Sequence, residues 1–179
     1  MRQPYLKTAG NCVMIVFGGM KMTKEGMHGQ VGAMKEFFDR STKVLDESDS
    51  GFAPKDGLFN VAQQVAHTAQ TVEWFIEGAF APGGFAMDFE SLDKGVRAVS
   101  SLAAARAWMD RACASAHAAV EANSEEAWGA PLPSGPIMGG MPRFAIFGAL
   151  TDHSAHHRGA LTVYSRLIGK VPAMPYMDM

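Results

Sequence analysis

Three histidines lie close together in the segment Asp152–Tyr164, which reads DHSAHHRGALTVY. Two of them, His153 and His157, are four residues apart, so on an α-helix they share one face about one turn from each other. Two imidazoles at this spacing can ligate one metal ion. The residue types and their spacing therefore indicate the chemistry of a histidine metal site.

The helix that carries these histidines must place two of them among apolar residues. At about 100° per residue, the predicted helix has one apolar stripe, formed by Ile146, Leu150, Leu161, Tyr164 and Ile168. His153 and His157 fall inside this stripe, whereas His156 lies off its edge and Arg158 points nearly the other way. Because a buried polar group without a partner costs a few kcal/mol, the two imidazoles need either hydrogen-bond partners or a metal ion. Both explanations remain open at this point.

A third ligand would complete a catalytic site, since such sites commonly use three protein ligands and keep one position for water or substrate. His67 is the best candidate, because it lies in the middle of a second predicted helix and bundles build metal sites from facing helices. The aliphatic stripe of that helix consists of Val61, Val65, Val72 and Ile76. His67 lies on another side, together with Gln63, Gln64, Thr71 and Trp74. This side is either a semi-polar pocket lining or a solvent face, and we interpret His28 and His117 as surface residues.

Neighbouring residues exclude several catalytic motifs. Ser154 stands where HExxH zinc proteases carry their glutamate, and His156 takes the glutamate position of the inverted HxxEH motif. The sequence has no GxSxG elbow and no GxGxxG or GxxxxGK[ST] loop, so nucleotide binding has no support. No catalytic side chain is assigned; the expected nucleophile is a metal-bound water or a substrate thiol.

Four helical patterns position these residues. Apolar residues at three- and four-residue spacing predict helices over 30–46, 61–77, 92–122 and 142–167. Asn60 is expected to cap the second helix. With no convincing series of strands, the leading fold is an all-α four-helix bundle.

The connections between these helices are long. Residues 49–56 read as a loop, and Gly78, followed by Pro82-Gly83-Gly84, is expected to end the second helix and start a loop. Residues 123–142 hold three prolines and a Gly-Gly pair and predict a loop of about 20 residues, a length that is often functional. Gly169 is expected to cap the last helix.

Composition limits the class of protein. The chain of 179 residues is 47% hydrophobic, which fits one globular domain. Its net charge of −2 argues against nucleic-acid binding, and no apolar run approaches the ~20 residues of a membrane span. Cys12 and Cys113 form no CxxC pair, which is typical of a cytoplasmic protein.

The N-terminal residues 1–29 are predicted to form a short apolar arm on a single domain of residues 30–179. The apolar run Cys12–Phe17 is shorter than the hydrophobic region of a signal peptide. It is either a short strand, an arm packed on the body or an extension upstream of the functional start, since Met20 or Met22 could begin the chain.

These residues resemble a known family. Val65-Ala-His67 in the second helix and His153-Ser-Ala-His-His157-Arg-Gly159 in the last are similar to motifs of the DinB-like (YfiT-like) metal-binding four-helix bundles. The resemblance covers about residues 30–170. It implies a divalent metal ion held by His67, His153 and His157, an open metal face and often a homodimer.

The resemblance also suggests classes of activity. Family members include transferases and isomerases that use a low-molecular-weight thiol, and metal-dependent hydrolases. Many members carry glutamine after HRG, where this chain has Ala160. Three imidazoles and a water suit zinc, nickel or iron.

Three hypotheses about function follow. The leading one is a metal-dependent enzyme, a thiol-dependent transferase or isomerase or a hydrolase, that acts on a small molecule. The second is a non-catalytic bundle that binds a metal or ligand for stability or sensing. The third is a plain bundle whose core histidines are satisfied by hydrogen bonds.

Overall fold

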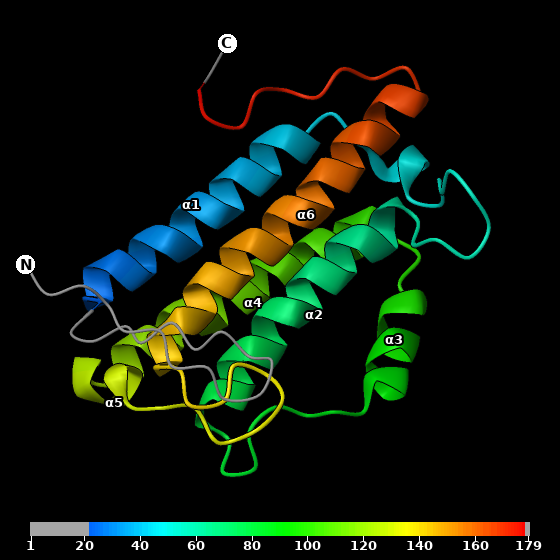
Figure 1. The fold of residues 1–179 in the computed structure, drawn as a ribbon. Helices are drawn as coiled ribbons and strands as arrows, with labels where there is room; N and C mark the ends of the chain where they lie inside the picture. The colour runs from blue at the N-terminus through cyan, green and yellow to red at the C-terminus, as the bar shows by residue number, and fades with distance from the viewer. Residues whose placement is uncertain (1–21, 178–179) are drawn as a thin grey trace, which may run out of the picture.

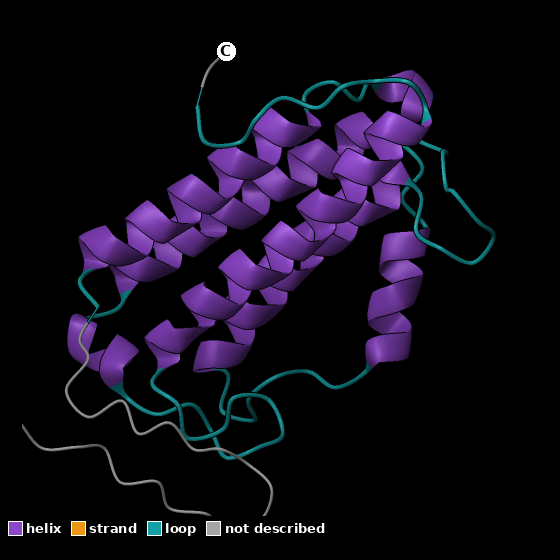
Figure 2. Cartoon of the chain, turned by 45° about the horizontal axis from the view of Figure 1, so that its top comes forward, coloured by secondary structure: helices purple, strands orange, loops and turns teal. Residues whose placement is uncertain are grey.

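The computed structural model describes residues 22–177, and these form an all-helical bundle (Figure 1). The four long helices are α1 (Lys24–Thr42), α2 (Val61–Phe80), α4 (Leu102–Ala122) and α6 (Ile146–Leu167). The shorter elements are α3 (Phe89–Arg97), α5 (Glu125–Gly129) and the 3-10 helices η1 (Glu47–Asp49) and η2 (Arg143–Ala145). Figure 2 shows helices and loops but no strand in this part of the chain, which confirms the predicted fold class.

The bundle places α2 beside α4 and α6, and places α1 beside the same two helices. In Figure 1, α1 and α6 run in one direction while α2 and α4 run in the other. Helices that are consecutive in sequence therefore lie diagonally opposite each other twice: α1 and α2, and α4 and α6. The long connections 43–60 and 123–145 exist because the chain must cross an end of the bundle at these two points.

The predicted helix over 92–122 is two helices in the structure, because residues 98–101 interrupt it. The side chain of Ser101 accepts a hydrogen bond from an amide in the first turn of α4. Ser50 and Glu47, from the connection between α1 and α2, accept hydrogen bonds from two more amides of that turn, at 2.9 and 2.8 Å. Three oxygens thus satisfy amides that an uninterrupted helix would have paired internally.

The first helix begins earlier than its predicted start at residue 30. Thr23 caps α1, since its side chain accepts a hydrogen bond from the Gly26 amide at 3.1 Å. Residues 24–29 therefore belong to a bundle helix and not to an arm. The rest of the predicted arm, residues 1–21, lies outside the described residues, so the apolar run Cys12–Phe17 stays a prediction.

Two glycines behave differently from each other. Gly78 does not end α2, which continues to Phe80. Its missing side chain instead leaves room for the Phe85 ring. Gly169 ends α6 as predicted, with a φ of 78°. The amides of Gly169 and Lys170 close the turn onto the carbonyls of Arg166 and Ser165, the pattern of a Schellman motif.

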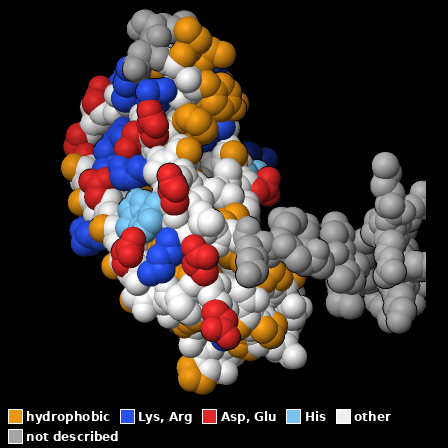
Figure 3. Space-filling view, turned by 90° about the vertical axis from the view of Figure 1, so that its left-hand side faces the viewer, with side chains coloured by type: hydrophobic (Ala, Val, Ile, Leu, Met, Phe, Trp, Pro, Cys, Tyr) orange, Lys and Arg blue, Asp and Glu red, His pale blue; other side chains and the backbone are white. Residues whose placement is uncertain are grey.

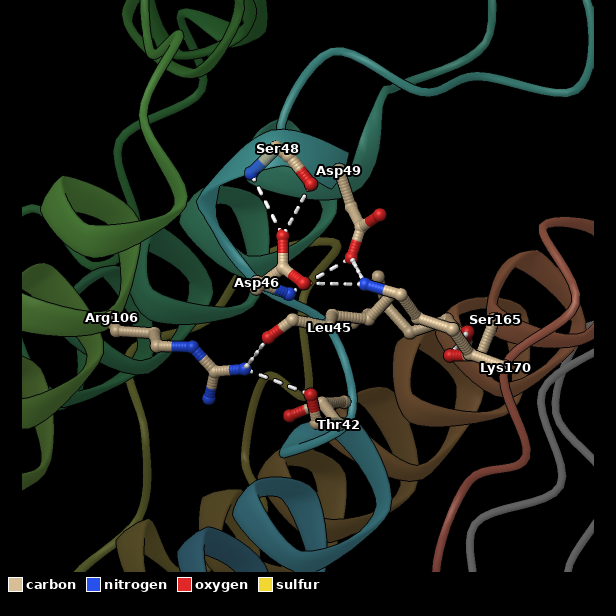
Figure 4. Close-up of polar contacts among 9 residues, drawn as sticks. Thr42, Leu45, Asp46, Ser48, Asp49, Arg106, Ser165 and Lys170 are labelled. Atoms are coloured by element: carbon tan, nitrogen blue, oxygen red, sulfur yellow. Dashed lines mark hydrogen bonds and ion pairs between the residues drawn. The ribbon is translucent and has the colours of Figure 1, made fainter.

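Polar contacts join the connection between α1 and α2 to α4 and to the end of α6 (Figure 4). Lys170, just after α6, pairs with Asp46 at 2.7 Å and with Asp49 at 2.5 Å. The hydrogen bonds from Lys170 and Ser48 lower the pKa of Asp46 to about 2. Arg106 of α4 donates hydrogen bonds to the backbone carbonyls of Thr42, the last residue of α1, and of Leu45 just after it. These contacts hold the first connection against α4 and the end of α6.

None of the helices within residues 22–177 is both long enough and apolar enough to cross a membrane.

Gly78→Ala is expected to destabilise the fold. A Cβ at this position would overlap the Phe85 ring, and overpacking of this kind costs about 1–3 kcal/mol. Gly32→Ala, in the interior of α1, is the matched control, because a Cβ there meets nothing within 4 Å. It is expected to be neutral or to stabilise by up to about 1 kcal/mol. Urea denaturation measures both, and equal effects would contradict this account of Gly78.

Candidate metal centre

The structure brings His67, His153 and His157 together between α2 and α6. One ring nitrogen from each histidine can be chosen so that all three lie within 4.8 Å of one another. The ring centroids are 5.1 Å apart for His67 and His153, 4.8 Å for His67 and His157, and 4.5 Å for His153 and His157. The two histidines of one helix thus converge with a histidine that is 86 or more positions earlier in the chain.

Burial of the last helix agrees with its predicted apolar stripe. Ile146, Leu150, Leu161 and Tyr164 are buried, and His157 is 8% exposed among them. His153 is half-buried and His156 is exposed. Arg158 points to the opposite side of α6, where its guanidinium lies over the rings of Phe37 and Tyr176. The apolar stripe of α6 therefore distinguishes the inward-facing His153 and His157 from the exposed His156.

A chain of hydrogen bonds orients His157. The hydroxyl of Tyr164 donates to the backbone carbonyl of Phe59 at 3.1 Å, and accepts from Nε2 of Gln64 at 3.3 Å. The other end of the Gln64 amide, Oε1, therefore faces Nδ1 of His157, at 2.6 Å. Since a carbonyl oxygen only accepts, Nδ1 of His157 carries the proton, and the lone pair of Nε2 points into the histidine cluster.

The nitrogens inside the cluster have the spacing of metal ligands. Nε2 of His157 and Nε2 of His153 are 3.3 Å apart. Zinc–imidazole bonds of about 2.0–2.1 Å at a tetrahedral angle require about 3.3 Å between ligand atoms. The other nitrogen of His153, Nδ1, is buried without a hydrogen-bond partner, and it is the nitrogen that carries the proton when Nε2 serves as the ligand. The residues present therefore fit a divalent ion.

Burial keeps the three imidazoles neutral. Loss of hydration, followed by the nearby histidines, lowers the pKa of His157 to about 3 and that of His153 to about 4. Burial also lowers the pKa of His67. An imidazole binds a metal ion only through an unprotonated nitrogen. The cluster is therefore in its ligand form at neutral pH without any proton having to leave.

Three donors make up the cluster, and within residues 22–177 no fourth histidine, cysteine or carboxylate joins them. A site with three protein ligands leaves a coordination position for another molecule, which is the arrangement of catalytic zinc sites. Phe59 packs against the ring of His67 at 5.2 Å, and Arg97 of α3 lies over the Phe59 ring at 4.7 Å. The end of α3 therefore lies beside the cluster.

The other two histidines lie on the opposite side of the bundle. His28 of α1 and His117 of α4 are partly exposed, which agrees with their interpretation as surface residues, but they also contact each other, which the sequence did not indicate. Sequence reasoning also missed the roles of Gln64 and Tyr164. The only signal for Gln64 was its position three residues before His67, on the same side of the second helix.

The fold and the site together define a class: a helical bundle with a candidate three-histidine metal centre between two of its helices. The chain belongs to the DinB superfamily, whose family model matches residues 35–161. This span contains all three histidines of the cluster, and the expected family is confirmed. None of the curated proteins matches the chain significantly.

Gln64→Leu is expected to weaken metal binding roughly 10- to 100-fold, the usual effect of removing a residue that orients a metal ligand. The leucine fills similar space but leaves the tautomer of His157 free. Tyr164→Phe, which removes only the hydroxyl that orients Gln64, is expected to have a smaller effect. Competition with a chromogenic chelator measures both affinities. Unchanged affinity in Gln64→Leu would contradict the assigned role of Gln64.

The metal-free protein is expected to lose stability as the pH falls from about 6.5 toward 4. In this window, the unfolded chain protonates histidines whose pKa is near 6.5, whereas His153 and His157 stay neutral in the folded state. The unfolded state then binds more protons, so protonation favours unfolding. Chelator-treated protein should melt at a lower temperature at pH 5 than at pH 7. The difference should shrink in His153→Gln, and its absence in the wild type would contradict these pKa values.

Proposed function

We propose that this chain is a metal-dependent enzyme that acts on a small molecule. The observation that carries the proposal is the cluster of three neutral, convergent imidazoles without a fourth protein donor among the described residues. Structural zinc sites are normally closed by four protein ligands. A site with three such ligands is suited to bind and activate a further molecule.

The proposed ligands are His67, His153 and His157, and the proposed ion is zinc, nickel or iron, all of which accept imidazole ligands. When bound, such an ion supplies Lewis acidity and lowers the pKa of a water or thiol in its open position. The protein supplies the rest. Gln64 holds the ring of His157 in one tautomer, and buried apolar neighbours limit the access of water from the core side.

A thiol-dependent transferase or isomerase is the first candidate reaction class, and a hydrolase is the second. The support for both is membership of the DinB superfamily together with the open three-histidine arrangement. A low-molecular-weight thiol is the proposed co-substrate in the first case. We also propose a homodimer and a cytoplasmic location, the latter supported by the free, buried thiol of Cys113.

The purified protein is expected to retain one equivalent of divalent metal in the cluster. His67→Ala, His153→Ala and His157→Ala should each lose it, whereas His156→Ala should retain it, because His156 is exposed and is not one of the three convergent donors, although its ring contacts that of His157. Chelator should lower the melting temperature of the wild type but not that of His67→Ala. Metal analysis by mass spectrometry and thermal denaturation measure these effects. Equal metal loss in all four variants would contradict the assignment.

Turnover separates catalysis from binding. Wild-type protein, its chelator-treated form and His153→Ala are compared on a small thiol with an electrophile, and on a panel of ester and amide substrates. Turnover that requires both the metal and His153 supports an enzyme. Metal binding without turnover of either substrate class favours a bundle that binds metal for stability or sensing.

A further inference from the structure

A second group of metal-binding side chains lies between α1 and α4, on the opposite side of the bundle from the three-histidine cluster. Nδ1 of His28 and Nδ1 of His117 are 2.7 Å apart, and the ring centroids are 4.9 Å apart with an angle of 22° between the ring planes. Glu121 lies four residues after His117, so both occupy the same face of α4. Its carboxylate oxygen is 2.6 Å from Nε2 of His28.

The hydrogen bonds fix which nitrogen of His28 is available. A carboxylate only accepts, so Nε2 of His28 donates to Glu121 and carries a proton. Nδ1 of neutral His28 then has a lone pair, and this lone pair faces Nδ1 of His117. A single proton between the two Nδ1 atoms holds the pair together. An imidazole held from behind by a carboxylate is also the arrangement in which proteins present histidine to a metal ion.

We propose that His28 and His117, with Glu121 behind His28, form a second binding site for a divalent cation that prefers imidazole, such as zinc, nickel or copper. The ion takes the place of the shared proton, and His117 carries its own proton on Nε2 instead. Both rings remain neutral in this exchange, so no net proton is released. Water completes the coordination.

The geometry needs only a small adjustment to admit the ion. Two zinc–imidazole bonds of about 2.0–2.1 Å place their nitrogens about 3.3 Å apart, so the two rings must separate by about 0.6 Å. The side chain of His28 is 28% exposed and that of Glu121 is 67% exposed, which leaves room for this movement. The core packing of α1 and α4 does not have to change.

Solvent can reach the site. His117 lines an open groove along α1 and α4 that also contains Lys35 and Asp110. Figure 3, which views this side of the molecule, shows a histidine patch at the surface among acidic and basic side chains. Lys24 is 3.6 Å from the second carboxylate oxygen of Glu121, and holds that carboxylate beside the histidines. A bound ion would join α1 to α4 near the start of α1.

The test is a calorimetric titration of chelator-treated protein with Zn²⁺ alone at pH 7.5. The wild type is expected to bind two equivalents, and His117→Ala and His28→Gln one each. His156→Ala, which removes an exposed histidine from another helix, is the matched control and should still bind two. Glu121→Gln should keep two equivalents but bind the second at least roughly tenfold more weakly. Far-UV circular dichroism of each variant verifies that it is folded.

The imidazole signals in nuclear magnetic resonance spectra test whether His28 and His117 are the residues that bind the second ion. Substoichiometric Cu²⁺ added to metal-free His153→Ala protein should broaden the signals of His28 and His117 and spare that of His156. An equal number of equivalents in the wild type, His117→Ala and His28→Gln would overturn the proposal. Because this equivalent depends on His117 and not on His153, its loss is distinguishable from failure of the three-histidine cluster.

Discussion

The hydrogen bond between Gln64 and His157 couples the chemistry of the cluster to the packing of the bundle. It joins α2 to α6 across 93 positions of sequence, and it forms only when the two helices have one particular register. The same register brings His67 into ring contact with both histidines of α6. A shift of one helical residue along α6 would turn His157 away and leave the Gln64 carbonyl without a partner.

This register is enforced by contacts at the end of the bundle where α2 begins and α6 ends. Tyr164, about two turns after His157, reaches the carbonyl of Phe59 just before α2. Beyond it, Lys170 closes α6 onto Asp46 and Asp49. The apolar core on either side is buried, so water cannot replace a lost ligand from within. The fold thus holds three imidazoles in a poorly hydrated place that disfavours their charged forms, and this selects the neutral state in which they bind metal.

The sequence predicted the parts of this arrangement that depend on local periodicity. The all-helical class, the Asn60 cap and the inward faces of His153 and His157 all follow from spacing within one helix. It did not predict the break at 98–101, because the oxygens of Glu47 and Ser50 that cap α4 come from a distant connection. The pairing of His28 with His117 was missed for the same reason, since each histidine alone reads as a surface residue.

Spacing within one helix could not decide whether His67 lines a pocket or faces solvent. The aliphatic stripe of α2 is buried in the core, and a histidine off that stripe is equally consistent with a pocket and with solvent. The position of α6 against the side of α2 that carries His67 decides between a pocket and solvent. The family resemblance favours a pocket over solvent for His67, and in the structure its side chain lies beside His153 and His157.

The most direct test of the central claim is zinc X-ray absorption spectroscopy on protein loaded with one equivalent of zinc. His117→Ala is the form to use, so that only the cluster between α2 and α6 competes for the ion. We expect three imidazole nitrogens at about 2.0–2.1 Å and one oxygen ligand from water. A shell that contains sulfur, a shell of oxygen alone, or protein that retains no zinc after dialysis would contradict it.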